Sequence, residues 1–284
     1  MLRVATPEDV DAILAFLLPY AATSMFLRSN LLAHGVEEKE HRHGGTFLLW
    51  EEHGALRGVL AHSNQGLMLC QCPDASPEVW RDFAAWLVGK NVAGISGDVA
   101  QVRAAVQAFG WPEEFLSLNR TEPLFELDFK DLLPRISTIR APHETDFELL
   151  ARWFAAYAVD AGIEPDIAIA RGNAEVRAKR AINECNIRLL VEDGELISMA
   201  GINAQADQMV QIGGVYTPPE RRGEGFAGQV VAAFLNELRH EGIQQAILFA
   251  ASSKAARAYE KIGFRQIGEY QLCLLKTPHI QGRP

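Results

Sequence analysis

The chain carries the same structural plan twice, and this internal repeat constrains its fold more than any other feature of the sequence. Residues 3–9 and 140–146 each begin with arginine and lead through proline, threonine and acidic residues into an amphipathic helix pattern. Residues 48–56 and 189–196 each read as a strand, an acidic turn with glycine, and a returning strand, which is the pattern of a hairpin.

A third pair of segments closes the two halves. Residues 102–111 resemble residues 257–264, and both contain a glycine followed by an aromatic residue. The spacing between equivalent residues rises from 137 at the first pair to 153 between Gly110 and Gly263. We therefore predict a tandem duplication in which the second half carries an insertion between its hairpin and its closing helix.

Length and composition agree with this plan. The chain has 284 residues, of which 48% are hydrophobic and 22% charged, enough for two domains with sizeable cores. We predict domains over residues 1–134 and 135–284, with a boundary near Pro134. The predicted fold class is α+β, in which each domain is a mixed, mostly antiparallel twisted sheet with helices on both faces.

Charge and cysteine content limit the classes of partner and compartment. The net charge of −9 disfavours nucleic acid and anionic membranes as partners. The four cysteines are too few and too uneven for a disulfide scaffold, and the acidic residues after Arg3 do not fit a signal peptide. The apolar stretch over residues 10–27 is interrupted by Pro19 and reads as a core helix. We therefore expect a cytoplasmic protein.

No metal is predicted. Cys70 and Cys72 lack a second pair at zinc spacing, and the Glu-His-Arg-His run at residues 40–43 has no third ligand nearby. We interpret the first as structural and the second as a solvated loop.

The insertion contains the most informative segment of the chain. A strand pattern over residues 209–216 stops at Pro218 and Pro219, because proline cannot donate to a sheet ladder. A glycine-rich turn comes next, and then apolar residues recur at helical spacing from Phe226 to Leu238.

A strand, a glycine-rich turn and a helix N-terminus together form an anion site. The N–H groups of the first helical turn have no partner within the helix, and the helix dipole favours negative charge there. Gly223 and Gly225 allow close approach of the backbone, and Arg221 and Arg222 add positive charge. This arrangement favours a phosphate or pyrophosphate ligand.

Two common pyrophosphate-binding patterns fit poorly. A P-loop requires Lys and Ser or Thr after its glycine, whereas Phe226 and Ala227 follow Gly225. The dinucleotide pattern G-x-G-x-x-G is present, but the next strand, residues 246–251, does not end in the acidic residue that pattern needs.

The segment Arg222-Gly223-Glu224-Gly225-Phe226-Ala227 resembles the coenzyme A loop of the GNAT acetyltransferase superfamily, whose signature is Arg/Gln-x-x-Gly-x-Gly/Ala. A strand over residues 247–249 and a helix that carries Tyr259 and ends in Gly-Phe are similar to the next motif of that family. The resemblance covers about residues 136–276. One departure is Ser252, which replaces an asparagine that many members carry before this helix, although serine still caps a helix.

The resemblance implies direct transfer of an acetyl group from acetyl-CoA to an amine within a ternary complex. It implies that main-chain groups of the strand end bind the pantetheine arm and that the loop binds the pyrophosphate. The expected coenzyme-binding residues are Val215, Tyr216, Thr217, Arg221, Arg222, Gly223, Glu224, Gly225, Phe226, Ala227 and Ser252.

Tyr259 is the candidate general acid. A tyrosine with a pKa near 10 stays protonated at neutral pH and can donate a proton to the departing thiolate. The alternative interpretation is that Tyr259 only packs against its neighbours. Many relatives carry a glutamate base on the strand before the loop, but the residue there is Gln211. The general base is therefore left open among Asp207, Glu184, Glu192 and a chain of water molecules.

The first half lacks these motifs. Residues 69–78 contain no glycine signature, and Val106 stands where the second half has Tyr259. The resemblance therefore predicts a degenerate first domain with a structural or acceptor-binding role.

The predicted function is that of an acetyl-CoA-dependent N-acetyltransferase acting on a small-molecule or peptide amine. The alternatives are a transferase for a longer acyl-CoA and a non-catalytic acyl-CoA-binding sensor, the latter because the base carboxylate is missing. The identity of the acceptor, the acyl chain length and the oligomeric state are left open.

Overall fold

A computed structural model describes residues 1–133, 135 and 137–282 of the chain. Two compact units are present. The first unit consists of Met1–Glu122 together with Glu269–Pro284, and the second unit of Pro123–Gly268. The domain boundary predicted near Pro134 falls on a residue outside the described ones.

The strands of the first unit follow the order β1-β2-β3-β4-β5-β12 within the sheet; β4 and β5 pair in parallel, and the other neighbouring pairs in this order are antiparallel. Its strands are β1 (Leu2–Val4), β2 (Gly45–Glu52), β3 (Ala55–Ser63), β4 (Leu67–Gln71) and β5 (Asn91–Asp98), with parts of β6 (Leu116–Asp128) and β12 (Arg265–Ile280). Its helices are α1 (Val10–Leu17), α2 (Met25–His34), α3 (Pro77–Leu87) and α4 (Val99–Phe109).

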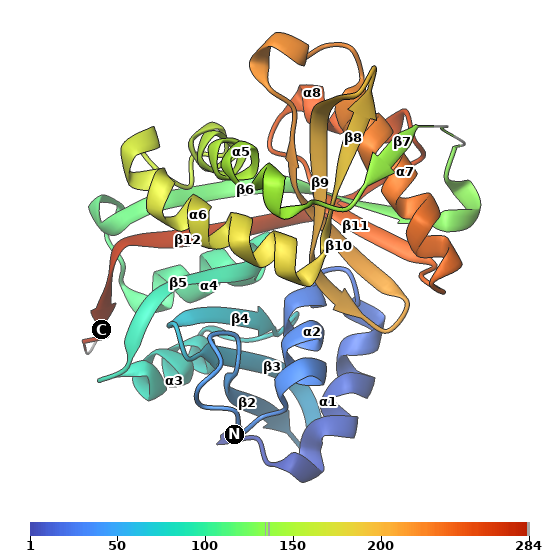
Figure 1. Ribbon diagram of the computed structural model, residues 1–284. Helices are drawn as coiled ribbons and strands as arrows, with labels where there is room; N and C mark the ends of the chain where they lie inside the picture. Colours follow the sequence, from blue (N-terminus) through green and yellow to red (C-terminus); the bar gives the residue numbers. More distant parts are fainter. Residues whose placement is uncertain (134, 136, 283–284) are drawn as a thin grey trace. The chain divides into compact units, whose positions relative to one another are not determined.

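The second unit repeats this plan in the order β6-β11-β10-β9-β8-β7, with β10 and β11 as its parallel pair (Figure 1). Its strands are the end of β6, β7 (Thr138–Arg140), β8 (Ile187–Glu192), β9 (Glu195–Ala206), β10 (Met209–Tyr216) and β11 (Gln245–Phe249). Its helices are α5 (Phe147–Asp160), α6 (Ile167–Glu184), α7 (Phe226–His240) and α8 (Ser253–Glu260). The predicted fold class, a mixed, mostly antiparallel sheet with helices on both faces, is confirmed, and the strands of both halves belong to one sheet.

Each unit contains a strand from the other half of the sequence. Residues Leu124 to Asp128 of β6 pair antiparallel with β11 in the second unit. Residues Tyr270 to Ile280 of β12 pair antiparallel with β5 in the first unit. The two halves therefore exchange their last strands, and a division of the chain near residue 134 does not separate two complete sheets.

The internal repeat is visible in detail at the start of each half. Arg3 forms an ion pair with Asp9 at 2.7 Å, and Arg140 forms the equivalent pair with Asp146 at 2.6 Å. Asp9 also accepts from the backbone N–H of Thr6, and Asp146 from that of His143. Both aspartates thus tie a short edge strand to the helix that comes after it, at the same spacing in the two halves.

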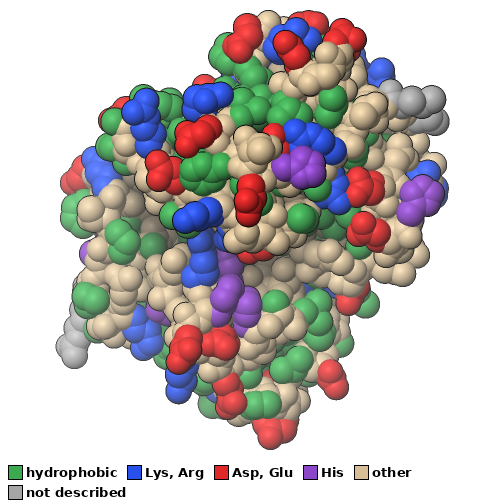
Figure 2. Space-filling view, viewed as in Figure 1, with side chains coloured by type: hydrophobic (Ala, Val, Ile, Leu, Met, Phe, Trp, Pro, Cys, Tyr) green, Lys and Arg blue, Asp and Glu red, His purple; other side chains and the backbone are tan. Residues whose placement is uncertain are grey.

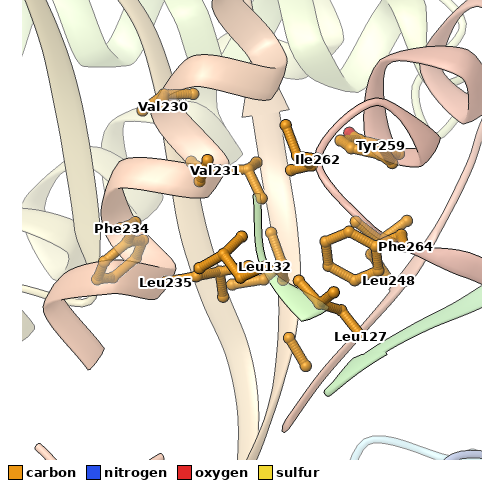
Figure 3. Packing of buried hydrophobic residues seen from close by; sticks show 14 of the residues in the cluster. Leu127, Leu132, Val230, Val231, Phe234, Leu235, Leu248, Tyr259, Ile262 and Phe264 are labelled. Carbon is orange, nitrogen blue, oxygen red and sulfur yellow. The ribbon is translucent and has the colours of Figure 1, made fainter. Parts of the chain in front are cut away.

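The core of the second unit lies between its sheet and helices α7 and α8 (Figure 3). One face of α7 is fully buried there, including Val230, Val231, Phe234 and Leu235, which recur at helical spacing. Strand β6 contributes Phe125 and Leu127 to the same core. On the opposite face of the sheet, α5 and α6 form a second cluster with β8, β9 and Tyr216.

The described residues offer neither a membrane span nor a metal centre. None of their helices combines the length and the apolar character that a membrane span requires. No group of three His, Cys, Asp or Glu side chains among them is arranged to hold a metal ion. Acidic and basic side chains are interspersed over the face of the molecule seen in Figure 2.

Candidate functional site

Strands β10 and β11 separate at a defined point. Their parallel pairing runs from Met209 opposite Gln245 to Ile212 opposite Leu248, and β10 then continues to Tyr216. Just beyond the last pair, the pairing with β9 is irregular between Gly213, which lies opposite Gly201, and Tyr216, and Gly214 in this interval has a φ of +61°. A bulge bends a strand and re-aims the residues after it, so this glycine pair directs the end of β10 away from β11.

The first unit provides an internal comparison. Its equivalent strands, β4 and β5, stay paired to the end, from Leu67 opposite Gly94 to Cys70 opposite Gly97. Strand β4 also pairs with β3 in an unbroken register. The opening between parallel strands is therefore a property of the second unit and accompanies its glycine pair.

The glycine-rich loop joins the end of β10 to helix α7. A short 3-10 turn, Pro219–Arg221, is followed by Gly223 and Gly225 with φ of +92° and +87°. A Cβ atom at either glycine would meet no other atom within 4 Å, so the backbone conformation, not crowding, requires glycine. Gly228 has a different role, because a Cβ there would lie 3.2 Å from the carbonyl oxygen of Ala258 and would press on α8.

Among the described residues, no side chain caps the N-terminus of α7. Gly225 occupies the N-cap position without a capping side chain, and the first turn holds no acidic residue. No hydrogen bond within the described ranges involves the backbone N–H groups of residues 223–228. In the first unit, by contrast, α3 begins with Pro77, which has no N–H group, and carries Glu78 in its first turn. The loop of the second unit can therefore bind an anion through main-chain groups.

Both loop arginines have acidic partners. Arg222 forms an ion pair with Asp160, at the end of α5, and its Nε donates to the carbonyl oxygen of Thr217 at 2.9 Å. Arg221 pairs with Glu192 at 3.3 Å. The side chains in these two ion pairs are at least about a third exposed. Exposed ion pairs contribute little free energy, so an anionic ligand can replace the carboxylates as partners of the arginines.

The three residues predicted to bind the pantetheine arm lie at the end of β10 and in the turn after it. The side chain of Val215 packs against the core under α7, whereas the buried ring of Tyr216 packs on Trp153 of α5 at 6.0 Å. Burial raises the pKa of Tyr216, and the nearby Asp160 carboxylate raises it further. Ser198, buried in β9, donates to the carbonyl oxygen of Tyr216 and lies 2.9 Å from the Thr217 hydroxyl, which fixes this strand end.

Helix α8 carries the two remaining predicted residues. Ser252 is its N-cap, and the hydroxyl oxygen accepts from the N–H of Ala255 at 3.2 Å. Tyr259 is 6% exposed and packs edge-on against Phe264 at 6.1 Å, beside Ile262 (Figure 3). Its ring is thus part of the core, which fits the packing interpretation and leaves its role as an acid a prediction.

The three carboxylates considered as a base lie in the turn before β10, at the end of α6 and at the end of β8. Asp207 stands in the turn between β9 and β10, five residues before Ile212, which is about 17 Å along an extended strand. Glu184 pairs with Arg180 at the end of α6, and Glu192 pairs with Arg221. Sequence reasoning did not identify Asp160, Ser198 or Asn203 as residues near the site. Their contacts join segments that lie far apart in the chain, so no local sequence pattern indicates them.

Comparison with known proteins finds one family model that matches the second half and solved structures that share the fold. Residues 190–273 match the family model described as FR47-like protein. A GNAT acetyltransferase from Colwellia psychrerythraea shares the fold at 11% identity and a TM-score of 0.54, over 97% of this chain and 99% of that one.

Two further solved structures share the fold over both halves. A GCN5-related N-acetyltransferase from Sphaerobacter thermophilus has 15% identity and a TM-score of 0.56, covering 99% of this chain and 96% of its own. A protein from Drosophila has 16% identity and a TM-score of 0.61, covering 96% and 98%. No curated protein matches the chain by sequence.

Proposed function

We propose, from the premise that this chain is a member of the GNAT acetyltransferase superfamily, that its second unit binds acetyl-CoA and transfers the acetyl group to a small-molecule or peptide amine. The proposal rests on one observation. The part of β10 that is no longer paired with β11 leads directly, through the glycine-rich loop, to the uncapped N-terminus of α7. The first unit, which lacks both features, would have a structural or acceptor-binding role. A cytoplasmic location remains a prediction.

In this proposal the chain acts mainly by positioning. The N–H groups of residues 223–228 and the two arginines hold the pyrophosphate, and the end of β10 offers main-chain groups to the pantetheine arm. The amine nitrogen attacks the thioester carbon, the carbon–sulfur bond breaks, and Tyr259 gives a proton to the departing thiolate. The proton lost by the nitrogen passes to solvent.

The test is release of the coenzyme thiol from acetyl-CoA in the presence of a panel of amines. We expect amine-dependent release by the wild type, and a loss of about a hundredfold or more in turnover for Tyr259→Phe. The affinity for acetyl-CoA should not change, because phenylalanine keeps the buried ring and removes only the hydroxyl group. Tyr20→Phe, in the first unit, is the control and should keep full turnover.

Three outcomes would contradict parts of the proposal. Binding of acetyl-CoA without thiol release for any amine would favour the alternative of an acyl-CoA sensor. Faster turnover with a longer acyl-CoA would favour the other alternative. Unchanged turnover of Tyr259→Phe would leave this tyrosine with a packing role only.

A further inference from the structure

Two carboxamide side chains stand beside the opening between β10 and β11. Gln211 precedes the last paired residue, Ile212, and is 2% exposed. Its Nε2 donates to the carbonyl oxygen of Ile212 at 2.6 Å, while its Oε1 has no hydrogen-bond partner. A buried acceptor left without a donor costs about 1–3 kcal/mol, so this oxygen is suited to receive an N–H group from a ligand.

Asn203 occupies a bulge in β9 next to this position. The pairing of β9 with β10 passes from Ala204 opposite Gln211 directly to Ile202 opposite Ile212, which leaves Asn203 without an opposite residue. A Cβ atom at Gly213 would lie only 1.9 Å from Asn203 Nδ2. The carboxamide therefore covers Gly213, and only glycine there leaves room for it. Within the described part of the chain, no hydrogen bond involves this side chain.

Both carboxamides lie on the face of the sheet that carries α5. Side chains alternate along β10, so Val210 and Ile212 face the core under α7, while Gln211 and Gly213 face the other side. Tyr216, on that side, packs against α5, and a Cβ at Gly214 would reach the ring of Phe154. Asn203 is exposed on this face, so an acceptor can reach the carboxamides from the α5 face.

Within the described residues, neither carboxamide forms a hydrogen bond with a carboxylate. A carboxamide oxygen accepts an N–H group but does not compensate a full positive charge, and a buried ammonium without a counter-ion is strongly disfavoured. An alkyl amine such as a lysine side chain has a pKa near 10.4 and is charged at pH 7, whereas more weakly basic amines are largely uncharged.

We infer that Asn203 and Gln211 bind the acceptor and select a weakly basic amine, one that arrives uncharged, over an alkyl ammonium. The inference rests on the proposed function and narrows its substrate class. The neutral nitrogen forms a bond to the acetyl carbon, the carbon–sulfur bond breaks, and the nitrogen loses one proton to solvent while the thiolate gains one. No separate base is needed to deprotonate the amine before attack.

The test compares two isomeric acceptors, 4-methylaniline and benzylamine, which have the same atoms but differ in basicity. With acetyl-CoA at pH 7, we expect the wild type to acetylate 4-methylaniline at least about tenfold faster, the factor that corresponds to about 1.4 kcal/mol. Gln211→Glu keeps the size of the side chain and supplies a carboxylate, so it should shift the preference toward benzylamine by at least about tenfold. Asn203→Ala should raise the KM for 4-methylaniline.

Control measurements separate this inference from the proposed function. Gln205→Glu adds the same charge at an exposed position of β9 and should leave the preference between the isomers unchanged. All three variants should bind acetyl-CoA as the wild type does. A wild type that binds acetyl-CoA but prefers benzylamine, or does not acetylate 4-methylaniline, overturns the inference while the coenzyme site stands. A wild type that does not bind acetyl-CoA overturns the proposed function itself.

Discussion

At the scale of single residues, both loop arginines are partly exposed and are paired with carboxylates. Arg222 contacts Asp160, the carbonyl oxygen of Thr217 and the ring of Tyr216, whose centroid lies 5.7 Å from the guanidinium carbon. These contacts join the loop, the end of β10 and the end of α5. A bound pyrophosphate would compete with the Asp160 carboxylate for the same guanidinium group.

This competition predicts that Asp160→Asn binds acetyl-CoA more tightly than the wild type. The expected gain is at most about fivefold at low salt, because exposed ion pairs contribute about 0.2–1 kcal/mol. The gain should shrink as salt is added. Calorimetric titration at two salt concentrations measures it, with Glu175→Gln on α6 as a control for the same charge change. Weaker binding by Asp160→Asn would instead mean that Asp160 holds Arg222 in place for the ligand.

At the scale of elements, the Arg140–Asp146 pair connects edge strand β7 to helix α5, as Arg3–Asp9 connects β1 to α1. Asp146 is buried, and its hydrogen bond with Arg140 lowers the pKa of the carboxyl group. Because the pKa is lower in the folded than in the unfolded chain, the stabilisation is fully present above the ordinary carboxyl pKa of about 4. It is lost as the pH falls through the lowered value.

Asp146→Asn should therefore lower the free energy of unfolding at pH 7 by about 1.5–3 kcal/mol, the contribution of a hydrogen bond to a charged group. The difference from the wild type should decrease as the pH is lowered below about 4. Urea unfolding at a series of pH values measures both effects. Glu148→Gln, an exposed change in the same helix, is the control, and equal losses for the two variants would contradict this role of Asp146.

Local elements could be predicted from the sequence, whereas contacts between distant segments could not. The strand over residues 209–216, the loop and α7 follow from apolar spacing, proline and glycine within about thirty residues, and the structure has β10 at those bounds. The exchange of β6 and β12 has no such signal, because a strand's alternation does not say which sheet it joins. The Arg222–Asp160 pair and the placement of Asn203 over Gly213 likewise depend on the folded chain.

At the scale of the whole molecule, the two units share one plan and differ at the loop after the first strand of the parallel pair. Both retain the edge ion pair, the parallel strand pair and the helix that connects its two strands. In the second unit, eight residues (218–225) separate Thr217 from α7, whereas in the first unit four (73–76) separate Cys72 from α3. The longer loop, its glycines and the separation of β10 from β11 all occur in the second unit. We therefore predict one coenzyme site per chain. The end of strand β6 belongs to the second unit's core.

The most direct measurement is a calorimetric titration of the full chain with acetyl-CoA, which reports stoichiometry as well as affinity. We predict one molecule bound per chain, and a loss of affinity of at least about tenfold, or about 1.4 kcal/mol, for Gly225→Asp. Gly242→Asp is the matched control, because Gly242 lies just past the other end of α7 with a similar φ of +90° and equally open surroundings. Two molecules per chain, no binding by the wild type, or equal losses for the two variants would contradict the assignment of a single coenzyme site to the loop before α7.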